Sequence, residues 1–597
     1  MKDSMKTCQH SLSDDIVYKE VVIIGNGPSG MVTSFMLAGN VPYLKQVPED
    51  LPIDEMLRAR LSHLQPGKNL YETDLIELAE GLEGRSQNPI PLLMDNLLRP
   101  CADLGIQADS LIEWKFDIEK QIDHIVLGRG PPGGAWHTFP PSVRTLSPGA
   151  WLALPPHAAA GAGRLSARAV AKYCRRYVHA CGLQRYFRNN VLVTRVSVFR
   201  PSGPPCASAC PLNAAFSVYG YDASCGRAFR YVCRRVVLAA GAGDRPNTLE
   251  PRLAPHASHA LHHIERALHV LANYTGAPPG VLVVGSGVSA ADAVCLARRA
   301  RLRLHHAHRA RADALARLAP QAYPDYCQVY KMMCDGPAGN HPNYTSHPEH
   351  IIVDITPIDN QNTQEYEDSA LRLKRVTLLN LVTNETTTIT VNLIAVLIGS
   401  KPDLFFLQTN FNLDCIDIKC LKCTEETKHA AKRKIEDTQR QCFLKNHWYY
   451  LKSVLGQSIQ SCKSRYLNYT EINGNSDTKC IVPDCNKREK ENTVENGMKE
   501  DKDWSCEIIP YSEIENKIKC TCQQNPYSSG IGFGIDPKKP VDGRSNPIAI
   551  DKSTHELLNG PKGLYALGPL TADNFVRFIP GGALAIVASI HKESKSE

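Results

Sequence analysis

Two glycine-rich turns, each set between a short apolar strand and an apolar helix, constrain the fold of this chain most. The first, Gly25–Gly30 (GNGPSG), follows the β-branched run Val21–Ile24 and precedes Met31–Leu37. The second, Gly285–Ala290 (GSGVSA), follows the run Val281–Val284. In such turns the first glycine permits a tight bend, the second lets the backbone approach a pyrophosphate, and the third position sets the helix–strand spacing. The pattern predicts an α/β fold with two nested Rossmann-like dinucleotide-binding domains.

The first turn favours FAD because of the segment that follows the next predicted strand, Ile122–Leu127. That segment is Gly130–His137 (GPPGGAWH), in which paired glycines let the chain pass close to a flat ring. Trp136 can form a wall beside such a ring. A purely structural glycine turn with a half-buried tryptophan is the alternative for these motifs taken singly.

The acidic residue that usually ends the second strand and holds the ribose is absent from the first unit. Gly128 occupies that position, and Arg129 follows it. Glu49 and Asp50 lie at a plausible distance from Gly25, but no strand is expected before them.

The second turn favours NADPH. Alanine at its third position, Ala290, is common where NADP binds. The next predicted strand, Leu302–His306, leads to Arg309, whose guanidinium can pair with the 2′-phosphate. An ordinary solvated arginine is the alternative for Arg309 alone. Because the chain contains two such units, each one supports the interpretation of the other as a dinucleotide-binding unit.

Composition limits the remaining possibilities. A chain of 597 residues is long enough for two cores, and its net charge of +7 is only a weak indication of a nucleic-acid partner, which we do not expect. The first 20 residues lack a signal-like apolar core, and no apolar run reaches membrane length. We therefore expect a cytoplasmic protein without a membrane span, in which the 21 cysteines are mostly free thiols.

Apolar runs and composition shifts suggest domain boundaries. Further strands are expected at Arg234–Ala239, Ile394–Ile398 and Gly563–Leu567, and helices at Leu165–Cys181 and Gly582–Ile590. Residues 41–120 show helical spacing without a strand signal, and after Leu407 the chain is rich in Lys, Glu, Asn, Cys and Thr. We predict an FAD-binding domain (15–44, 121–250 and 531–597), a helical insertion (45–120), an NADPH-binding domain (251–404) and a flexible insertion (405–530).

Taken in order, these motifs resemble the flavin-containing monooxygenases and, more closely, the oxidative stress-induced growth inhibitor family. The segments that carry the resemblance are Gly25–Gly30, Gly130–His137, Leu146–Pro155, Gly285–Ala290, Tyr323–Cys327, Asn343–Thr345 and Asn574–Gly582. They cover most of the chain outside the two insertions.

The resemblance implies an FAD-dependent, NADPH-consuming monooxygenase. In that picture NADPH reduces the flavin, and the reduced flavin traps dioxygen as a C4a-hydroperoxide that transfers one oxygen atom to the substrate. The cofactor carries the chemistry, so no catalytic side chain and no metal is assigned. The resemblance also implies a role in growth control and, for some members, in late cytokinesis at the midbody.

The resemblance also implies the site residues. Relatives carry an aspartate just after the glycine that ends the strand Gly563–Leu567, whereas this chain has Pro569, with Asp573 as the nearest substitute. The residues expected at the FAD are Gly25, Gly27, Pro28, Ser29, Gly30, Gly133, Gly134, Trp136, Gly568, Asp573, Gly581 and Gly582. Those expected at the NADPH are Gly285, Gly287, Ser289, Ala290 and Arg309, and Ser147 and Trp151 are expected on the substrate side.

Two other classes of protein compete with this interpretation. A disulfide reductase would need a redox cysteine pair after the first turn; the pairs Cys420–Cys423 and Cys520–Cys522 fall in the insertion instead. A zinc site there, with His429 and Cys442, is less favoured than free thiols. The serious rival is a scaffold or regulatory protein of weak or no activity, which keeps its nucleotides for stability and binds protein partners through the insertions.

Overall fold

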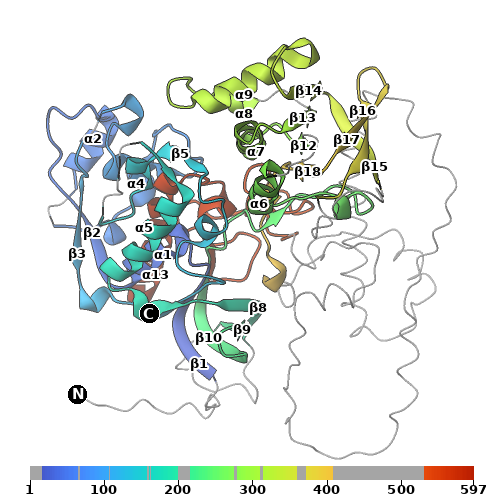
Figure 1. Cartoon of the computed structure of the whole chain (residues 1–597). Helices are drawn as coiled ribbons and strands as arrows, with labels where there is room; N and C mark the ends of the chain where they lie inside the picture. The colour runs from blue at the N-terminus through green and yellow to red at the C-terminus, as the bar shows by residue number, and fades with distance from the viewer. Residues whose placement is uncertain are drawn as a thin grey trace, which may run out of the picture.

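A computed structural model of the chain describes residues 16–64, 67–106, 108–157, 161, 163–199, 215–273, 279–309, 313–358, 371–407 and 530–596. Nearly all of the insertion predicted at 405–530, including its cysteine pairs, lies outside these residues. Two units built on parallel sheets are present, with the second inserted between strands of the first (Figure 1). The predicted nested α/β architecture is confirmed.

The first unit contains a seven-stranded sheet. Its parallel strands lie in the order β7 (Phe187–Arg188), β4 (His124–Leu127), β1 (Ile16–Ile24), β10 (Arg227–Leu238) and β20 (Leu564–Ala566). β9 (Phe216–Asp222) and β8 (Val191–Val198) continue the sheet in antiparallel fashion from the first half of β10. Because parallel strands end at the same edge, the segments that follow β1, β4, β10 and β20 meet there.

The alternation of side chains along β1 divides the core of this unit into two layers. Val21 and Ile23 pack with residues of α1 (Pro28–Leu37), α5 (Ala167–Ala180) and α13 (Ile579–Ser596), which cover one face (Figure 1). Val22 and Ile24 lie in the opposite core with Phe216, Leu404 and Phe533. A strand that is buried on both faces reads as a continuous apolar run, which is why the sequence revealed it.

The segment 45–120 contains α2 (Glu55–Ser62), α3 (Leu75–Ala79) and α4 (Pro89–Leu98), as its helical spacing indicated. The expectation that it has no strand is wrong, because β3 (Ile112–Phe116) pairs antiparallel with β2 (Asn40–Leu44). Trp114 packs edge-on against Phe35 of α1 at a centroid distance of 5.1 Å, whereas Glu113 and Lys115 face outwards. A strand with so few buried residues has a weak hydrophobic pattern.

The second unit is a four-stranded parallel sheet in the order β14 (Tyr344–Pro348), β13 (Arg303–His308), β12 (Gly280–Val284) and β18 (Leu393–Val396). α6 (Leu261–Ala272), α7 (Val288–Arg299) and α9 (Pro324–Asp335) pack on one face. The other face is covered by an antiparallel sheet of β15 (His350–Pro357), β16 (Lys374–Asn380) and β17 (Thr386–Val391), which no sequence pattern had indicated.

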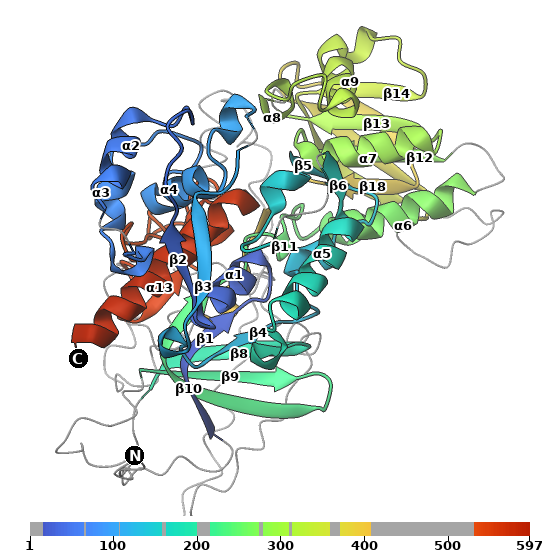
Figure 2. The same ribbon diagram turned by 90° about the vertical axis from the view of Figure 1, so that its left-hand side faces the viewer.

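The chain crosses between the units twice. β11 (Arg245–Pro246), on the way out, pairs antiparallel with β19 (Ser400–Lys401), on the way back. A hairpin of the first unit, β5 (Arg144–Pro148) and β6 (Arg164–Ser166), also lies between the units (Figure 2). Within the described residues, no helix is both long enough and apolar enough to cross a membrane.

Candidate dinucleotide sites

The first glycine turn joins β1 to α1, and each of its glycines meets a different demand. Gly25 has a φ of +117°, and a Cβ added there would lie 2.3 Å from the carbonyl oxygen of Ala239. A Cβ on Gly30 would lie 1.9 Å from the carbonyl oxygen of Gly25. A Cβ on Gly27 would meet no atom within 4 Å. The fold therefore requires the first and third glycines, and the second faces the open space that a pyrophosphate at a helix N-terminus needs.

The loop that contains Gly133 and Gly134 lies directly against this turn. The amide of Gly133 donates to the carbonyl oxygen of Asn26 at 2.9 Å, and a Cβ on Gly134 would lie 3.1 Å from the Cα of Gly27. Trp136 is half-buried on the core of the first unit, edge-on to Phe139 with centroids 5.5 Å apart. The structure thus brings the paired glycines to the first turn, as a flavin-lining role requires.

Asn26 accounts for the missing acid at the end of β4. Its side-chain amide donates to the carbonyl oxygen of Gly130 at 2.6 Å and to Oδ1 of Asn189 at 2.9 Å. A Cβ on Gly128 would lie 2.1 Å from Cγ of Asn26. An aspartate or glutamate at position 128 would therefore displace Asn26 from these hydrogen bonds.

Glu49 and Asp50 do not replace the missing acid. Both are exposed, and the strand that precedes them, β2, belongs to a separate two-stranded sheet. Arg129, which follows Gly128, lies 3.6 Å from Asp403, and this contact ties the end of β4 to the returning connection after β19. The expectation that no strand precedes Glu49 and Asp50 is wrong, but their position gives them no part in the first turn.

The C-terminal candidates divide into two groups. Gly568, with a φ of +72°, adjoins the first turn, since a Cβ on it would lie 2.4 Å from Oγ of Ser29. Gly581 and Gly582 lie inside α13 and permit close packing: added Cβ atoms would lie 2.3 Å from the Cα of Pro91 and 3.1 Å from the Cβ of Leu567. Both glycines therefore face protein rather than open space.

Asp573 is bound to the helical insertion. Its buried carboxylate accepts hydrogen bonds from Oγ of Ser86 at 2.6 Å and from Nδ2 of Asn88 at 2.9 Å. Burial raises the pKa of Asp573 to about 6, and the two hydrogen bonds oppose that shift. No sequence motif pointed to Ser86 and Asn88, which hold this carboxylate.

The second glycine turn has the same geometry as the first. Gly285 has a φ of +136°, and a Cβ on it would lie 2.3 Å from the carbonyl oxygen of Leu397. A Cβ on Gly287 would meet no atom within 4 Å, and Ala290 is fully buried, so its methyl group fits the helix–strand contact. Ser289 is exposed at the start of α7. The second turn therefore also leaves open space at its middle glycine.

Arg309 follows β13 directly and is exposed. β12 and β13 are parallel neighbours, with Val284 opposite Ala307, so both strands end at the same edge. Arg309 and the turn Gly285–Gly287 consequently lie at one edge of the sheet, where an adenosine 2′-phosphate would be bound.

His306 supports the second turn through a hydrogen bond to Gly285, a role that no sequence motif indicated. It is fully buried, with Nε2 2.7 Å from the carbonyl oxygen of Gly285 and Nδ1 3.0 Å from the hydroxyl of Tyr344. A carbonyl oxygen can only accept, so Nε2 carries the proton and the tyrosine hydroxyl donates to Nδ1. Burial lowers the pKa of His306 to about 3, which keeps the ring neutral.

This burial predicts a specific acid sensitivity. In the unfolded chain a histidine takes up a proton near pH 6.5, whereas His306 in the folded protein does so only near pH 3. Between these two pH values the unfolded state therefore binds one more proton at this residue than the folded state does. The contribution of His306 to the free energy of unfolding should fall by about 1.4 kcal/mol for each pH unit of acidification. Urea unfolding of wild-type protein and of the His306→Phe variant between pH 4 and 6 measures the difference. The variant should show the shallower slope, and parallel curves would contradict the prediction.

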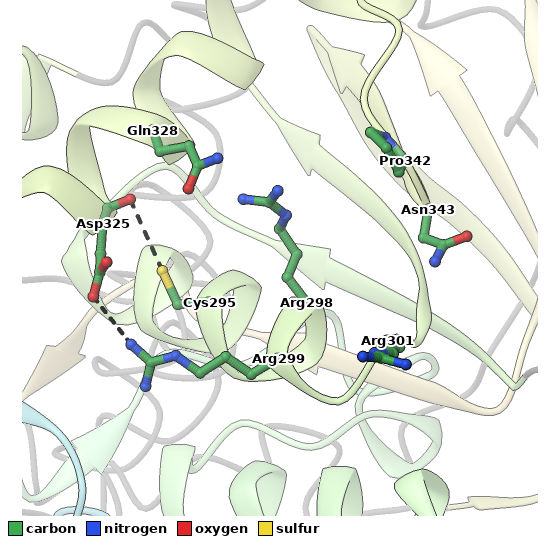
Figure 3. A pocket seen from close by; sticks show the side chains of 8 residues that line it. All are labelled: Cys295, Arg298, Arg299, Arg301, Asp325, Gln328, Pro342 and Asn343. Carbon is green, nitrogen blue, oxygen red and sulfur yellow. Dashed lines mark hydrogen bonds and ion pairs between the residues drawn. The ribbon is translucent and has the colours of Figure 1, made fainter.

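A basic cavity of about 480 Å³ lies at the opposite end of α7. Figure 3 shows Arg298, Arg299 and Arg301 among the side chains that line it, and the Arg299 guanidinium lies 3.0 Å from Asp325 of α9. The twelve residues of α7 put the glycine turn roughly 18 Å from these arginines. This cavity is therefore separate from the second glycine turn.

The residues expected on the substrate side lie in or beside the β5 strand. Ser147 is buried within β5, where Oγ1 of Thr145 donates to its carbonyl oxygen at 2.7 Å. Trp151, in the short helix that follows, lies under the guanidinium of Arg577 at 4.3 Å from the ring centroid. Trp151 is thus held by the C-terminal segment of the chain.

Among the described residues, no cluster of three or more His, Cys, Asp or Glu side chains could hold a metal ion. The eight cysteines among the described residues are free thiols: Cys101, Cys174, Cys181, Cys225, Cys233, Cys295, Cys327 and Cys334.

Comparison with known proteins gives two sets of similarities. The chain is 30% identical over 598 residues to oxidative stress-induced growth inhibitor 1 of Mus musculus, with 96% of this chain and 95% of the relative covered. It is 32% identical over 434 residues to oxidative stress-induced growth inhibitor 2 of Homo sapiens, with 66% of this chain and 82% of the relative covered. No family model matches the chain.

Among solved structures, the bacillithiol disulfide reductase Bdr of Bacillus cereus is similar with a TM-score of 0.39 and 14% identity, over 66% of this chain and 83% of that chain. The FAD-bound cadaverine monooxygenase DfoA of Erwinia amylovora has a TM-score of 0.36 and 13% identity, over 64% of this chain and 79% of that chain.

Proposed function

The chain belongs to the oxidative stress-induced growth inhibitor family, and on that premise we propose that it is an FAD- and NADPH-dependent monooxygenase. The observation that carries the proposal is the geometry of the two glycine turns. In each, the first glycine has a positive φ and abuts a backbone carbonyl, whereas the middle glycine faces open space. Two units with this shared geometry support two dinucleotides in one chain.

In this proposal the first turn holds FAD. The N-terminus of α1 presents its amides and its positive dipole to the pyrophosphate above Gly27. Gly133 and Gly134, which lie against that turn, line the flavin, together with Trp136 of the same loop. Once bound, the flavin supplies the redox and oxygen-transfer chemistry, while the chain positions it and excludes water.

The second turn would hold NADPH, with Arg309 on the 2′-phosphate. NADH lacks that phosphate, so Arg309→Ala should weaken NADPH binding by about tenfold or more and leave NADH binding nearly unchanged. Dissociation constants of both nucleotides, measured by fluorescence titration of the wild type and the variant, test this role. The exposed Arg252 of the same unit, replaced in the same way, is the matched control. Equal losses for NADPH and NADH would refute the assignment.

A regulatory scaffold is the second candidate, and two observations favour it. Asn26 fills the place of the ribose-binding acid, and the carboxylate of Asp573 is taken up by Ser86 and Asn88. In this version the nucleotides stabilise the fold and the insertions bind protein partners. For either candidate, the names of the relatives support a role in restraining cell growth. We propose that this role lies in the cytoplasm, with the midbody as a site in dividing cells, as the family resemblance implies.

A visible absorption spectrum of the purified chain tests the proposal, followed by addition of NADPH in air. Flavin bands that bleach and then recover while NADPH is consumed are the expected result. A protein that stays colourless and inert after FAD is supplied would contradict the enzyme and favour the scaffold.

A further inference from the structure

An aromatic and arginine cluster joins the two units at the hairpin β5–β6. The guanidinium of Arg164, in β6, lies 4.8 Å from the ring centroid of Tyr323 and 4.9 Å from that of Tyr326, at the start of α9. The two rings are nearly parallel, with an interplanar angle of 9°. We call Arg164, Tyr323 and Tyr326 the inter-unit clamp.

Hydrogen bonds fix the clamp to the first unit. Nε of Arg164 donates to the carbonyl oxygen of Thr145 at 2.7 Å, which holds the guanidinium in place over the rings. The hydroxyl of Tyr323 donates to the carbonyl oxygen of Leu146 in β5. Leu146 itself packs against the core of the second unit. Two of the family motifs, Leu146–Pro155 and Tyr323–Cys327, therefore meet at this contact.

The clamp also reaches the helix that begins at the second glycine turn. The hydroxyl of Tyr326 donates to Oδ1 of Asp292 at 2.8 Å, and Asp292 lies in α7 five residues after Gly287. Burial raises the pKa of Asp292 to about 6, while Tyr326 and Arg164 favour its charged form. Contacts thus run from β5, which follows the loop of Gly133 and Trp136, to the nucleotide-binding end of α7.

The covalent connections alone give little control over orientation. They pass through β11 and β19, two strands of two residues each, which pair at Arg245 with Lys401 and at Pro246 with Ser400. A pair this short fixes few backbone angles, so most of the control over orientation has to come from side-chain contacts between the units. A further hydrogen bond joins the two units, from Oγ of Ser142 to the carboxylate of Glu265 at 2.7 Å. It is exposed to solvent, so it contributes little to holding the units together.

We propose that Arg164, Tyr323 and Tyr326 are positioning residues that hold the NADPH-binding unit against the FAD-binding unit in the orientation needed for hydride transfer. The inference rests on the proposed function. The clamp residues lie outside both glycine turns, so in this proposal they act through the orientation of α7 and β5 and not by binding a cofactor. A small misplacement of two reacting groups lowers the rate of transfer far more than it lowers affinity.

Three variants test the clamp. Arg164→Leu removes the cation over the two rings, Tyr323→Phe removes only the hydrogen bond to Leu146, and Arg168→Leu is the matched control. Arg168 is exposed in α5 four residues from Arg164. FAD content and the NADPH dissociation constant should match wild type in all three. The rate of anaerobic flavin reduction at saturating NADPH should fall by about tenfold or more in Arg164→Leu, by less in Tyr323→Phe, and not in the control.

Hydrogen–deuterium exchange supplies a readout that needs no turnover. Arg164→Leu should increase exchange in both β5 and the start of α9, which belong to different units, and Arg168→Leu should change neither. Unchanged exchange in the first variant, or reduction at the wild-type rate, would overturn the inference. Wild-type protein that binds neither cofactor would overturn the proposed function, and the exchange experiment distinguishes the two failures.

Discussion

Purified Gly27→Glu protein is expected to fold normally and to contain no FAD. The position offers room for a side chain, since an added Cβ meets no atom within 4 Å, but that room is where a pyrophosphate would lie. A carboxylate about 4 Å from a phosphate costs about 4 kcal/mol at an effective dielectric constant near 20. That energy corresponds to roughly a thousandfold weaker binding. The visible spectrum of the purified protein and FAD titration of the apoprotein measure the loss.

The second turn provides the matched control. Gly287 is equally open, so Gly287→Glu should abolish NADPH binding and leave the flavin bound. Gly30→Ala is the contrasting variant, because its Cβ would lie 1.9 Å from the carbonyl oxygen of Gly25 and should disturb the fold itself. Normal FAD content in Gly27→Glu would contradict the first site. If the variant loses FAD but keeps the cellular role of the protein, the scaffold replaces the enzyme as the better account.

Replacement of Arg577 by leucine is expected to give the largest loss of stability. Arg577 and Asp95 are both 3% exposed, their side chains are joined by an ion pair, and Nη1 of Arg577 lies 2.8 Å from Asp103. Burial raises the pKa of Asp95 even though Arg577 and Arg99 oppose the shift. Without Arg577, a buried carboxylate loses its main partner, which typically costs 3–5 kcal/mol, here about 4 kcal/mol.

Urea unfolding of the variant tests this expectation against a surface ion pair. Arg299 and Asp325 are 3.0 Å apart, but their side chains are 65% and 56% exposed, so Arg299→Leu should cost less than about 1 kcal/mol. The double variant Arg577→Leu/Asp95→Leu should recover part of the loss, since no unpaired charge remains. Equal losses of unfolding free energy in Arg577→Leu and Arg299→Leu would show that the buried ion pair stabilises the protein no more than an exposed one.

Features that depend on local residues could be predicted from the sequence. Both glycine turns were found from the sequence because the demand on each glycine is local: a positive φ at Gly25 and Gly285, and a helix that starts within a few residues. The strands at β1, β10 and β12 were found for a similar reason, since strands buried on both faces appear as continuous apolar runs. The sequence alone therefore determined the two-unit α/β fold, the position of the glycine turn at the edge of each parallel sheet, and the family resemblance.

Only the tertiary structure decided which polar groups meet. Asn26 occupies the space beside Gly128 and is held there by partners 104 and 163 residues away, and Asp573 binds Ser86 across 487 residues. Arg577 pairs with Asp95 across 482 residues, and Arg164 meets Tyr323 and Tyr326 from another unit. Periodicity and turn chemistry specify the local backbone, but the partner of a buried polar side chain depends on which distant segments the packed core brings within hydrogen-bonding distance.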